Sequence, residues 1–167
     1  FLLTADSLAG VLPTIRSRCV SFAIAPVSPA DCTRYCTAHG VDKNTAALYS
    51  ELFDGHIGTV LTAARDKART EQVDKAMELA RAAQAGDSYT AAVLLAPYEK
   101  DKAGAAALLR DLRAVAAAGL QGSPHAPVQG QQAQRTLRLA EAAIQRLGAQ
   151  VNPKIVLTVF AARLAHA

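Results

Sequence analysis

The sequence predicts a mainly α-helical protein that begins with a short strand-bearing segment. Hydrophobic residues make up 51% of the 167 residues, so the chain can bury a core. Trp is absent and aromatic residues account for only 5%, so Ala, Leu, Val and Ile must build that core, and an Ala- and Leu-rich composition favours helices. From residue 29 onward the apolar residues recur at helical spacing, whereas residues 20–24 alternate as in a strand.

The strand-bearing segment covers residues 1–25. Residues 1–4 are apolar up to a threonine and predict the end of a buried strand. Residues 7–17 predict a short helix or turn, because Pro13 is typical of a helix start. Residues 20–24 predict a second strand. Pro26 and Pro29 then interrupt the chain and mark a boundary.

The remaining residues predict a three-helix unit at 26–66 and a longer helical bundle at 67–167. The expected helices cover about 30–39, 42–53, 56–65, 70–84, 88–96, 102–120, 132–147 and 153–164. Their expected N-caps are Ser28, Asp42, either Asp87 or Ser88, and Asn152. The Gly- and Pro-rich residues 119–130 predict a mobile loop.

Composition and spacing exclude several classes of function. The net charge of +4 permits an acidic partner but does not require one. No apolar run approaches the length of a membrane span, and three cysteines without a C-x-x-C pair indicate reduced thiols and a cytoplasmic location. No G-x-x-x-x-G-K-[ST] phosphate loop occurs. Because the sequence begins on Phe, we expect it to be a fragment or a cleaved product.

The sequence gives little support for a metal site, a hydrolase site or a nucleic-acid interface. Cys32 and Cys36 share a helix face, but only His39 is a nearby third ligand, so core thiols are favoured over a metal site. The histidines are scattered and carry no hydrolase pattern: His39, His56, His125 and His166. The basic residues near Arg69 alternate with acidic ones, which predicts a solvated helix face with i,i+4 pairs and not a nucleic-acid interface.

The stretch L-P-T-I-R-S-R-C, residues 12–19, is the most informative motif. Arg16 and Arg18 flank Ser17, and no carboxylate lies nearby in the sequence to pair with them. With the strand that ends at Thr4, this motif resembles the clamp-loader branch of the AAA+ ATPases. In that family Thr4 would fall at the sensor-1 position, and Ser17, Arg18 and Cys19 would form the SRC motif.

The resemblance implies an order of parts that matches the chain. Residues 1–25 would be the end of an AAA+ α/β core, residues 26–66 a three-helix lid, and residues 67–167 a helical collar that assembles the ring. Arg18 would be an arginine finger that reaches the nucleotide of a neighbouring subunit. Ser17 would help fix the turn and Cys19 would pack inward. The alternative is that Arg16 and Arg18 belong to a solvated basic turn.

Within the family the lid indicates which type of subunit is present. Hydrolysing subunits carry a G-x-x-R-x-A sensor-2 pattern, and the matching residues 55–60 read G-H-I-G-T-V, with Gly58 in place of the arginine. This departure resembles the delta-prime class of the bacterial DNA polymerase III clamp loader, which does not hydrolyse ATP. The alternatives are a gamma/tau-like ATPase subunit and an unrelated all-helical scaffold or DNA-binding domain.

The resemblance implies a subunit that is not itself an enzyme and binds no cofactor of its own. Its partners would be gamma/tau and delta subunits, bound through the collar, with ATP-Mg held by the neighbour. The sliding clamp and primed DNA would be contacted only indirectly, at the replisome in the cytoplasm.

Overall fold

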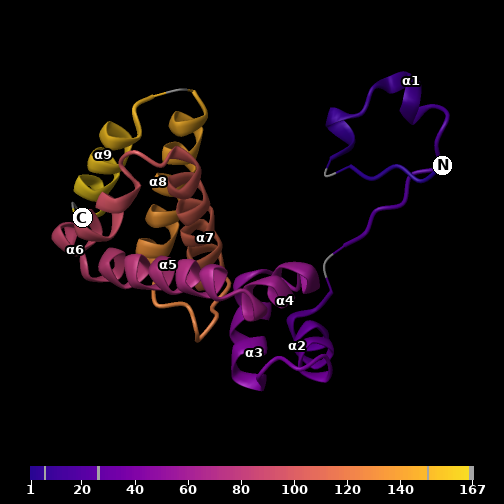
Figure 1. The fold of residues 1–167 in the computed structure, drawn as a ribbon, viewed down its shortest axis with the longest axis horizontal. Coiled ribbons are helices and arrows are strands. Elements are labelled where there is room, and N and C mark those ends of the chain that lie inside the picture. Colours follow the sequence, from indigo (N-terminus) through magenta and orange to yellow (C-terminus); the bar gives the residue numbers. More distant parts are fainter. Residues whose placement is uncertain (6, 26, 150, 166–167) are drawn as a thin grey trace.

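The computed structural model describes residues 1–5, 7–25, 27–149 and 151–165. Over these residues the protein is mainly helical, as predicted, and contains no strand. Figure 1 shows the helices labelled α2 to α9 gathered together, while the N-terminal segment with the short helix α1 stands away from them. The helical part therefore carries the core.

The helices fall close to the predicted ranges. The N-terminal segment contains a 3-10 turn η1 (Leu8–Gly10) and the short helix α1 (Pro13–Arg16). The α2–α4 unit consists of α2 (Pro29–Ala38), α3 (Lys43–Leu52) and α4 (Ile57–Arg65). The α5–α9 bundle consists of α5 (Lys67–Ala85), α6 (Ser88–Leu95), η2 (Ala96–Tyr98), α7 (Lys102–Leu120), α8 (Gly130–Gly148) and α9 (Pro153–Ala165).

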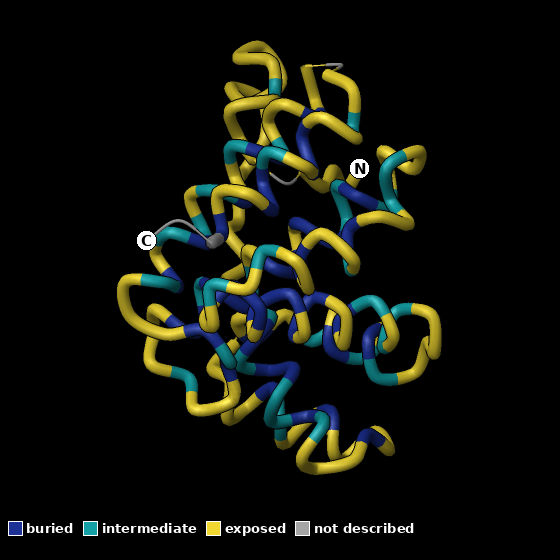
Figure 2. Tube along the Cα trace, turned by 90° about the vertical axis from the view of Figure 1, so that its left-hand side faces the viewer, coloured by how far each residue is buried: buried dark blue, intermediate teal, exposed yellow. Residues whose placement is uncertain are grey.

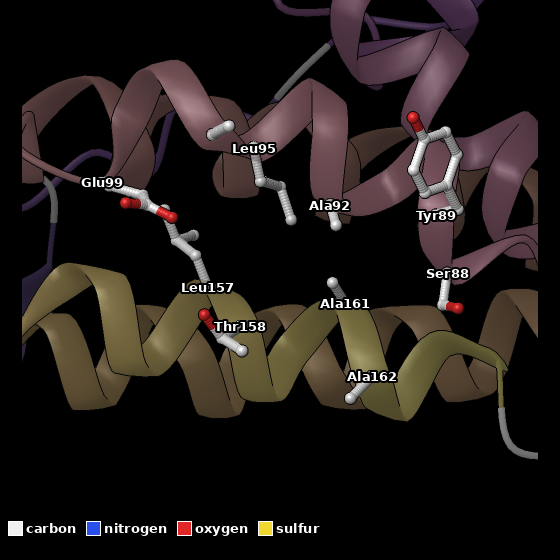
Figure 3. Close-up of a pocket in the computed structure, with 10 residues that line it drawn as sticks. Ser88, Tyr89, Ala92, Leu95, Glu99, Leu157, Thr158, Ala161 and Ala162 are labelled. Carbon is white, nitrogen blue, oxygen red and sulfur yellow. The ribbon is translucent and has the colours of Figure 1, made fainter.

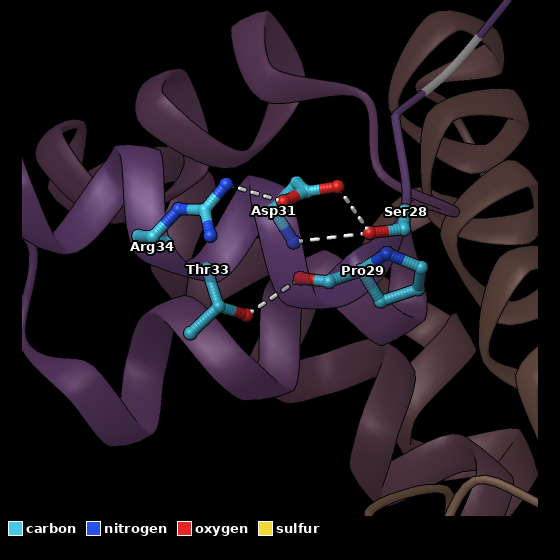
Figure 4. Close-up of polar contacts among 5 residues, drawn as sticks. All are labelled: Ser28, Pro29, Asp31, Thr33 and Arg34. Atoms are coloured by element: carbon cyan, nitrogen blue, oxygen red, sulfur yellow. Dashed lines mark hydrogen bonds and ion pairs between the residues drawn. The ribbon is translucent and has the colours of Figure 1, made fainter.

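Side-chain caps fix where helices begin. The Ser28 hydroxyl accepts a hydrogen bond from the Asp31 N–H at 3.1 Å and donates one to the Asp31 carboxylate at 2.8 Å, with Pro29 at the first helical position (Figure 4). At α6 the cap is Asp87 and not Ser88, because the Asp87 carboxylate accepts from the Thr90 N–H. The predicted cap residues at α3 and α9 also accept hydrogen bonds from N–H groups of the first turn: Asp42 and Asn152.

The two predicted strands do not form. Residues 1–4 and 20–24 lie without strand pairing, and their apolar side chains are exposed, including Phe1, Phe22 and Ile24. Alternation predicts which side chains share a face, but a strand also needs a partner for its N–H and C=O groups, and two short strands alone are only marginally stable. Pro26, predicted to interrupt the chain here, lies outside the described residues.

The α2–α4 unit has a small core built from Cys32, Cys36, Tyr49 and Leu52, among others. The guanidinium of Arg65, at the end of α4, closes the unit by donating to the carbonyl oxygen of His39 at 2.8 Å. The residues that connect the N-terminal segment to α2 pack against the turn before α4. There a Cβ on Gly55, which has φ +71°, would lie 1.8 Å from the carbonyl oxygen of Val27, so only glycine fits.

The α5–α9 bundle is organised around α7 and α8, which pack along each other, with α5 against α7 and α6 against α9. Figure 2 shows the buried residues as stripes along the helices. The loop between α7 and α8, predicted to be mobile, is instead anchored. Val128 is fully buried, and the Gln129 amide donates to the carbonyl oxygens of Ser123 and Ala126.

Candidate functional site

The SRC motif forms a compact turn on the N-terminal segment. Arg16 ends α1, and the Ser17 hydroxyl donates to the carbonyl oxygen of Thr14 at 3.1 Å. The Arg18 N–H donates to the carbonyl oxygen of Ile15 at 3.0 Å, which continues the turn past the helix. Both arginines are exposed, and neither forms an ion pair with any residue that the structure describes. The turn therefore presents a free guanidinium at Arg18.

The other two residues of the predicted site lie in different surroundings. Cys19 is exposed, so the prediction that it packs inward is wrong. The physical reason is that none of the described residues in 1–25 has a buried side chain for a thiol to pack against. Thr4 is also exposed, on an irregular stretch outside the turn. The structure thus brings Ser17, Arg18 and Cys19 into one turn and leaves Thr4 apart.

Gly58, the residue that the family resemblance would align with a sensor-2 arginine, lies in the first turn of α4. Gly58 is exposed there, and a Cβ on this residue would meet no atom within 4 Å. Any longer side chain would have room to extend into solvent. The absence of a side chain at Gly58 therefore does not follow from packing, in contrast to Gly55 three residues earlier.

A shallow groove, which no sequence pattern predicted, lies beside this turn. Its volume is about 380 Å³, and its lining residues are Val27, Asp31, Arg34, Tyr35, Ala38 and Ile57. The Tyr35 ring stacks on His39, with ring centroids 4.0 Å apart. Asp31 and Arg34 are paired with each other at 2.5 Å, so they offer no unpaired charge to a ligand.

A second groove of about 350 Å³ runs between α6 and α9 (Figure 3). Its walls are apolar, with Leu95 facing Leu157, and Glu99 lies at one end, where it pairs with Lys154 at 3.2 Å. The Tyr89 side chain stands beside the groove and is 78% exposed. Polar residues are few on both helices, so part of their apolar surface stays open to solvent.

The buried side chains of α2 are two cysteines. Cys32 and Cys36 are both fully buried, and burial, with the neighbouring Cys32 thiol, raises the pKa of Cys36 to about 11. No cluster of three potential metal ligands occurs among the residues that the structure describes. Both thiols belong to the core, and the raised pKa of Cys36 keeps that thiol protonated at neutral pH.

Arg69 corrects the prediction of a solvated face on α5. Its guanidinium forms a two-pronged ion pair with the buried Asp111 of α7, with one N–H···O distance of 2.6 Å. Asp111 interrupts the apolar stripe of Leu108, Leu112 and Val115, all buried. A charged residue inside such a stripe was the available signal that a partner must face it.

The histidines lie apart, as their spacing predicts. The Nδ1 atoms of His39 and His56 each lie 2.8 Å from a backbone carbonyl oxygen, of Tyr35 and Phe53 respectively. His125 is exposed in the loop between α7 and α8. His166 lies outside the described residues.

Over the part of the chain that the structure describes, no helix is both long and apolar enough to span a bilayer. Comparison with known proteins adds no relative: no family model matches the chain, and neither a curated protein nor a solved structure is significantly similar to it.

Proposed function

We propose that this chain is the C-terminal part of a non-hydrolysing clamp-loader subunit of the delta-prime type. It assembles with other loader subunits through the α5–α9 bundle and presents Arg18 to ATP bound by a neighbour. The observation that carries the proposal is the exposed SRC turn, in which Arg18 forms no ion pair with a described residue. A guanidinium that stays charged and unpaired suits a phosphate supplied by another chain.

The order of the helical units supports the same assignment. The α2–α4 unit would be the lid and the α5–α9 bundle the collar, in the order that the family resemblance implies. Gly58 favours the delta-prime type over a gamma/tau-like ATPase, because a lid without an arginine at this position lacks the usual contact with ATP. The chain would therefore act without a cofactor of its own, at the replisome in the cytoplasm.

The groove between α6 and α9 supports assembly through the bundle. Tyr89, Val93 and Ile155 leave more than half of their surfaces exposed on these two helices. Apolar surface of this kind is typical of a protein interface. The gamma/tau and delta subunits are the partners that the proposal places there, and the clamp and primed DNA would be contacted only through the assembled loader.

The test is steady-state ATP hydrolysis by a reconstituted loader with clamp and primed DNA. We expect Arg18→Ala in the intact subunit to lower the rate while leaving assembly unchanged in gel filtration. Arginine fingers contribute on the order of 10³ to 10⁵ in rate at their own site, but the loss would be partial because other subunits carry further sites. Arg18→Lys should not restore the full rate, since a point charge lacks the fork of donors.

Arg16→Ala is the matched control, because Arg16 lies in the same exposed turn and is not the proposed finger. It should change the rate much less than Arg18→Ala. Equal rates for wild type and Arg18→Ala, with assembly intact, would show that Arg18 is not a finger.

A further inference from the structure

The α2–α4 unit and the α5–α9 bundle are joined in the chain by one non-helical residue, Asp66. α4 ends at Arg65 and α5 begins at Lys67. The Asp66 backbone is extended, with φ −94° and ψ 111°, and its side chain caps α5 by accepting from the Ala68 N–H at 3.0 Å. One extended residue limits the angle between two helices only weakly, so tertiary contacts must fix that angle.

Arg69 makes the central contact of this junction. Its two terminal nitrogens donate to both carboxylate oxygens of Asp111 on α7, one of them at 2.6 Å. Its guanidinium carbon also lies 5.6 Å from the ring centroid of Phe53, which ends α3. One planar group therefore contacts the α2–α4 unit on one side and the middle of α7 on the other.

The Asp111 carboxylate also accepts a hydrogen bond from a second residue of α5. The Gln72 amide, one turn beyond Arg69, donates to Asp111 Oδ2 at 2.8 Å. The Asp111 side chain is only 7% exposed and that of Arg69 is 23% exposed. A bidentate pair in such surroundings accepts a narrow range of geometries, because a tilt of either group would leave a buried charge with a poor partner.

A polar contact also joins the α2–α4 unit directly to the bundle. The Ser123 hydroxyl, just beyond the end of α7, donates to the Glu51 carboxylate of α3. Asp111 lies in the middle of α7 and Ser123 beyond its end, so the two contacts hold α7 at separated points. Because the contacts are separated, the α2–α4 unit cannot rotate about one of them without breaking the other.

From this geometry we infer that Asp111 holds the Arg69 guanidinium against Phe53 as a latch, and that this contact keeps the α2–α4 unit at one angle on the bundle. The ion pair is retained for its geometry, since an apolar pair of similar volume could fill the same space without holding a side chain against Phe53. When the latch is absent, the remaining contact of Glu51 with Ser123 fixes the angle less tightly, so the α2–α4 unit takes a wider range of angles about Asp66. Arg69 and Asp111 are then positioning residues for Arg18, a consequence that rests on the proposed function, because the α2–α4 unit lies between the SRC turn and the bundle.

The angle is measured in the full chain by double electron–electron resonance. Spin labels are placed at two exposed sites, Thr37→Cys on α2 and Gln145→Cys on α8, with Cys19→Ser to remove the exposed thiol. Wild type should give one narrow distance distribution. Replacing the pair by Arg69→Met with Asp111→Leu should keep a cooperative thermal melt but broaden the distribution.

Two further variants make the test decisive. Arg69→Lys keeps the charge but loses the two-pronged geometry, so it should fold and give an intermediate width. Arg34→Met removes an exposed ion pair within α2 and should leave the distribution unchanged. A wild-type width in a folded Arg69→Lys or double variant overturns the latch, as does a broad distribution in wild type.

The reconstituted loader separates the latch from the proposed function. The Arg69→Met, Asp111→Leu variant should lower ATP hydrolysis in the same direction as Arg18→Ala, with assembly unchanged. If Arg18→Ala lowers the rate and the latch variant does not, the positioning role is overturned and the proposed function stands. If Arg18→Ala has no effect, the proposed function falls, and the distance measurement still decides the latch.

Discussion

We expect Gly119→Ala to destabilise the protein although the residue lies inside a helix. At an open helical site, alanine stabilises relative to glycine by about 1 kcal/mol. Gly119 is buried in the last turn of α7, where the loop before α8 crosses it. A Cβ there would lie 1.9 Å from the carbonyl oxygen of Val128, a backbone atom that cannot rotate away.

Relief of this overlap requires the loop to move off α7. Overpacking of a close contact costs about 1 to 3 kcal/mol. The fully buried Val128 side chain would be partly unseated, and its complete exposure would cost about 1.5 to 3 kcal/mol. These costs exceed the gain in helix propensity, so we expect a net loss of about 1 to 3 kcal/mol in the free energy of unfolding.

The assay is urea unfolding followed by far-ultraviolet circular dichroism. The matched control is Gly58→Ala, the same substitution in a helical site where a Cβ meets nothing within 4 Å. That variant should be stabilised by up to about 1 kcal/mol. If Gly119→Ala were as stable as Gly58→Ala, the close approach of the loop to α7 would be refuted.

Two further predictions concern ionisable groups. Hydrogen bonds from the hydroxyl and N–H of Thr90 lower the pKa of Asp87, so its contribution to stability is present above the ordinary carboxyl pKa of 3.8 and is lost as the pH falls below it. Thermal melts at decreasing pH should therefore show a steeper loss for wild type than for Asp87→Asn, and parallel losses would contradict this. A thiol reagent at about pH 8 should label Cys19 at once, but Cys32 and Cys36 only after denaturation, because both are buried and burial raises the pKa of Cys36 to about 11. Rapid labelling of all three thiols in the native protein would contradict the described core.

Arg69 shows the limit of local sequence patterns at the junction. Its neighbours in sequence alternate in charge and predict a solvated face, yet its partner Asp111 lies 42 residues away. The choice between water and Asp111 depends on where α7 packs, which no window of sequence contains. The close approach of the Val128 carbonyl oxygen to Gly119 could not be predicted either, because it also depends on how the loop packs on α7.

Some features of the candidate site could likewise be predicted from local sequence, and others depend on packing. Spacing in the sequence singled out residues 17–19 and Gly58, and the family roles assigned to them stay predictions. The inward packing of Cys19 was predicted wrongly, because it depends on a surface for the turn to pack against. The groove between α6 and α9 was missed because both helices are rich in apolar residues, and their few polar residues do not mark the face left open.

The sequence by itself determined the helices of this protein, because a helix satisfies its hydrogen bonds within one segment and its caps lie within one turn of its ends. Ser28, Asp42 and Asn152 therefore marked helix starts in advance, whereas the sequence pattern allows either Asp87 or Ser88 as the cap of α6. Only the tertiary structure decided whether the strand-like residues at 1–4 and 20–24 would pair, and whether Arg69 would be solvated. Those outcomes depend on partners that are distant in sequence, and their burial, charge and hydrogen bonds are settled only when the helices pack.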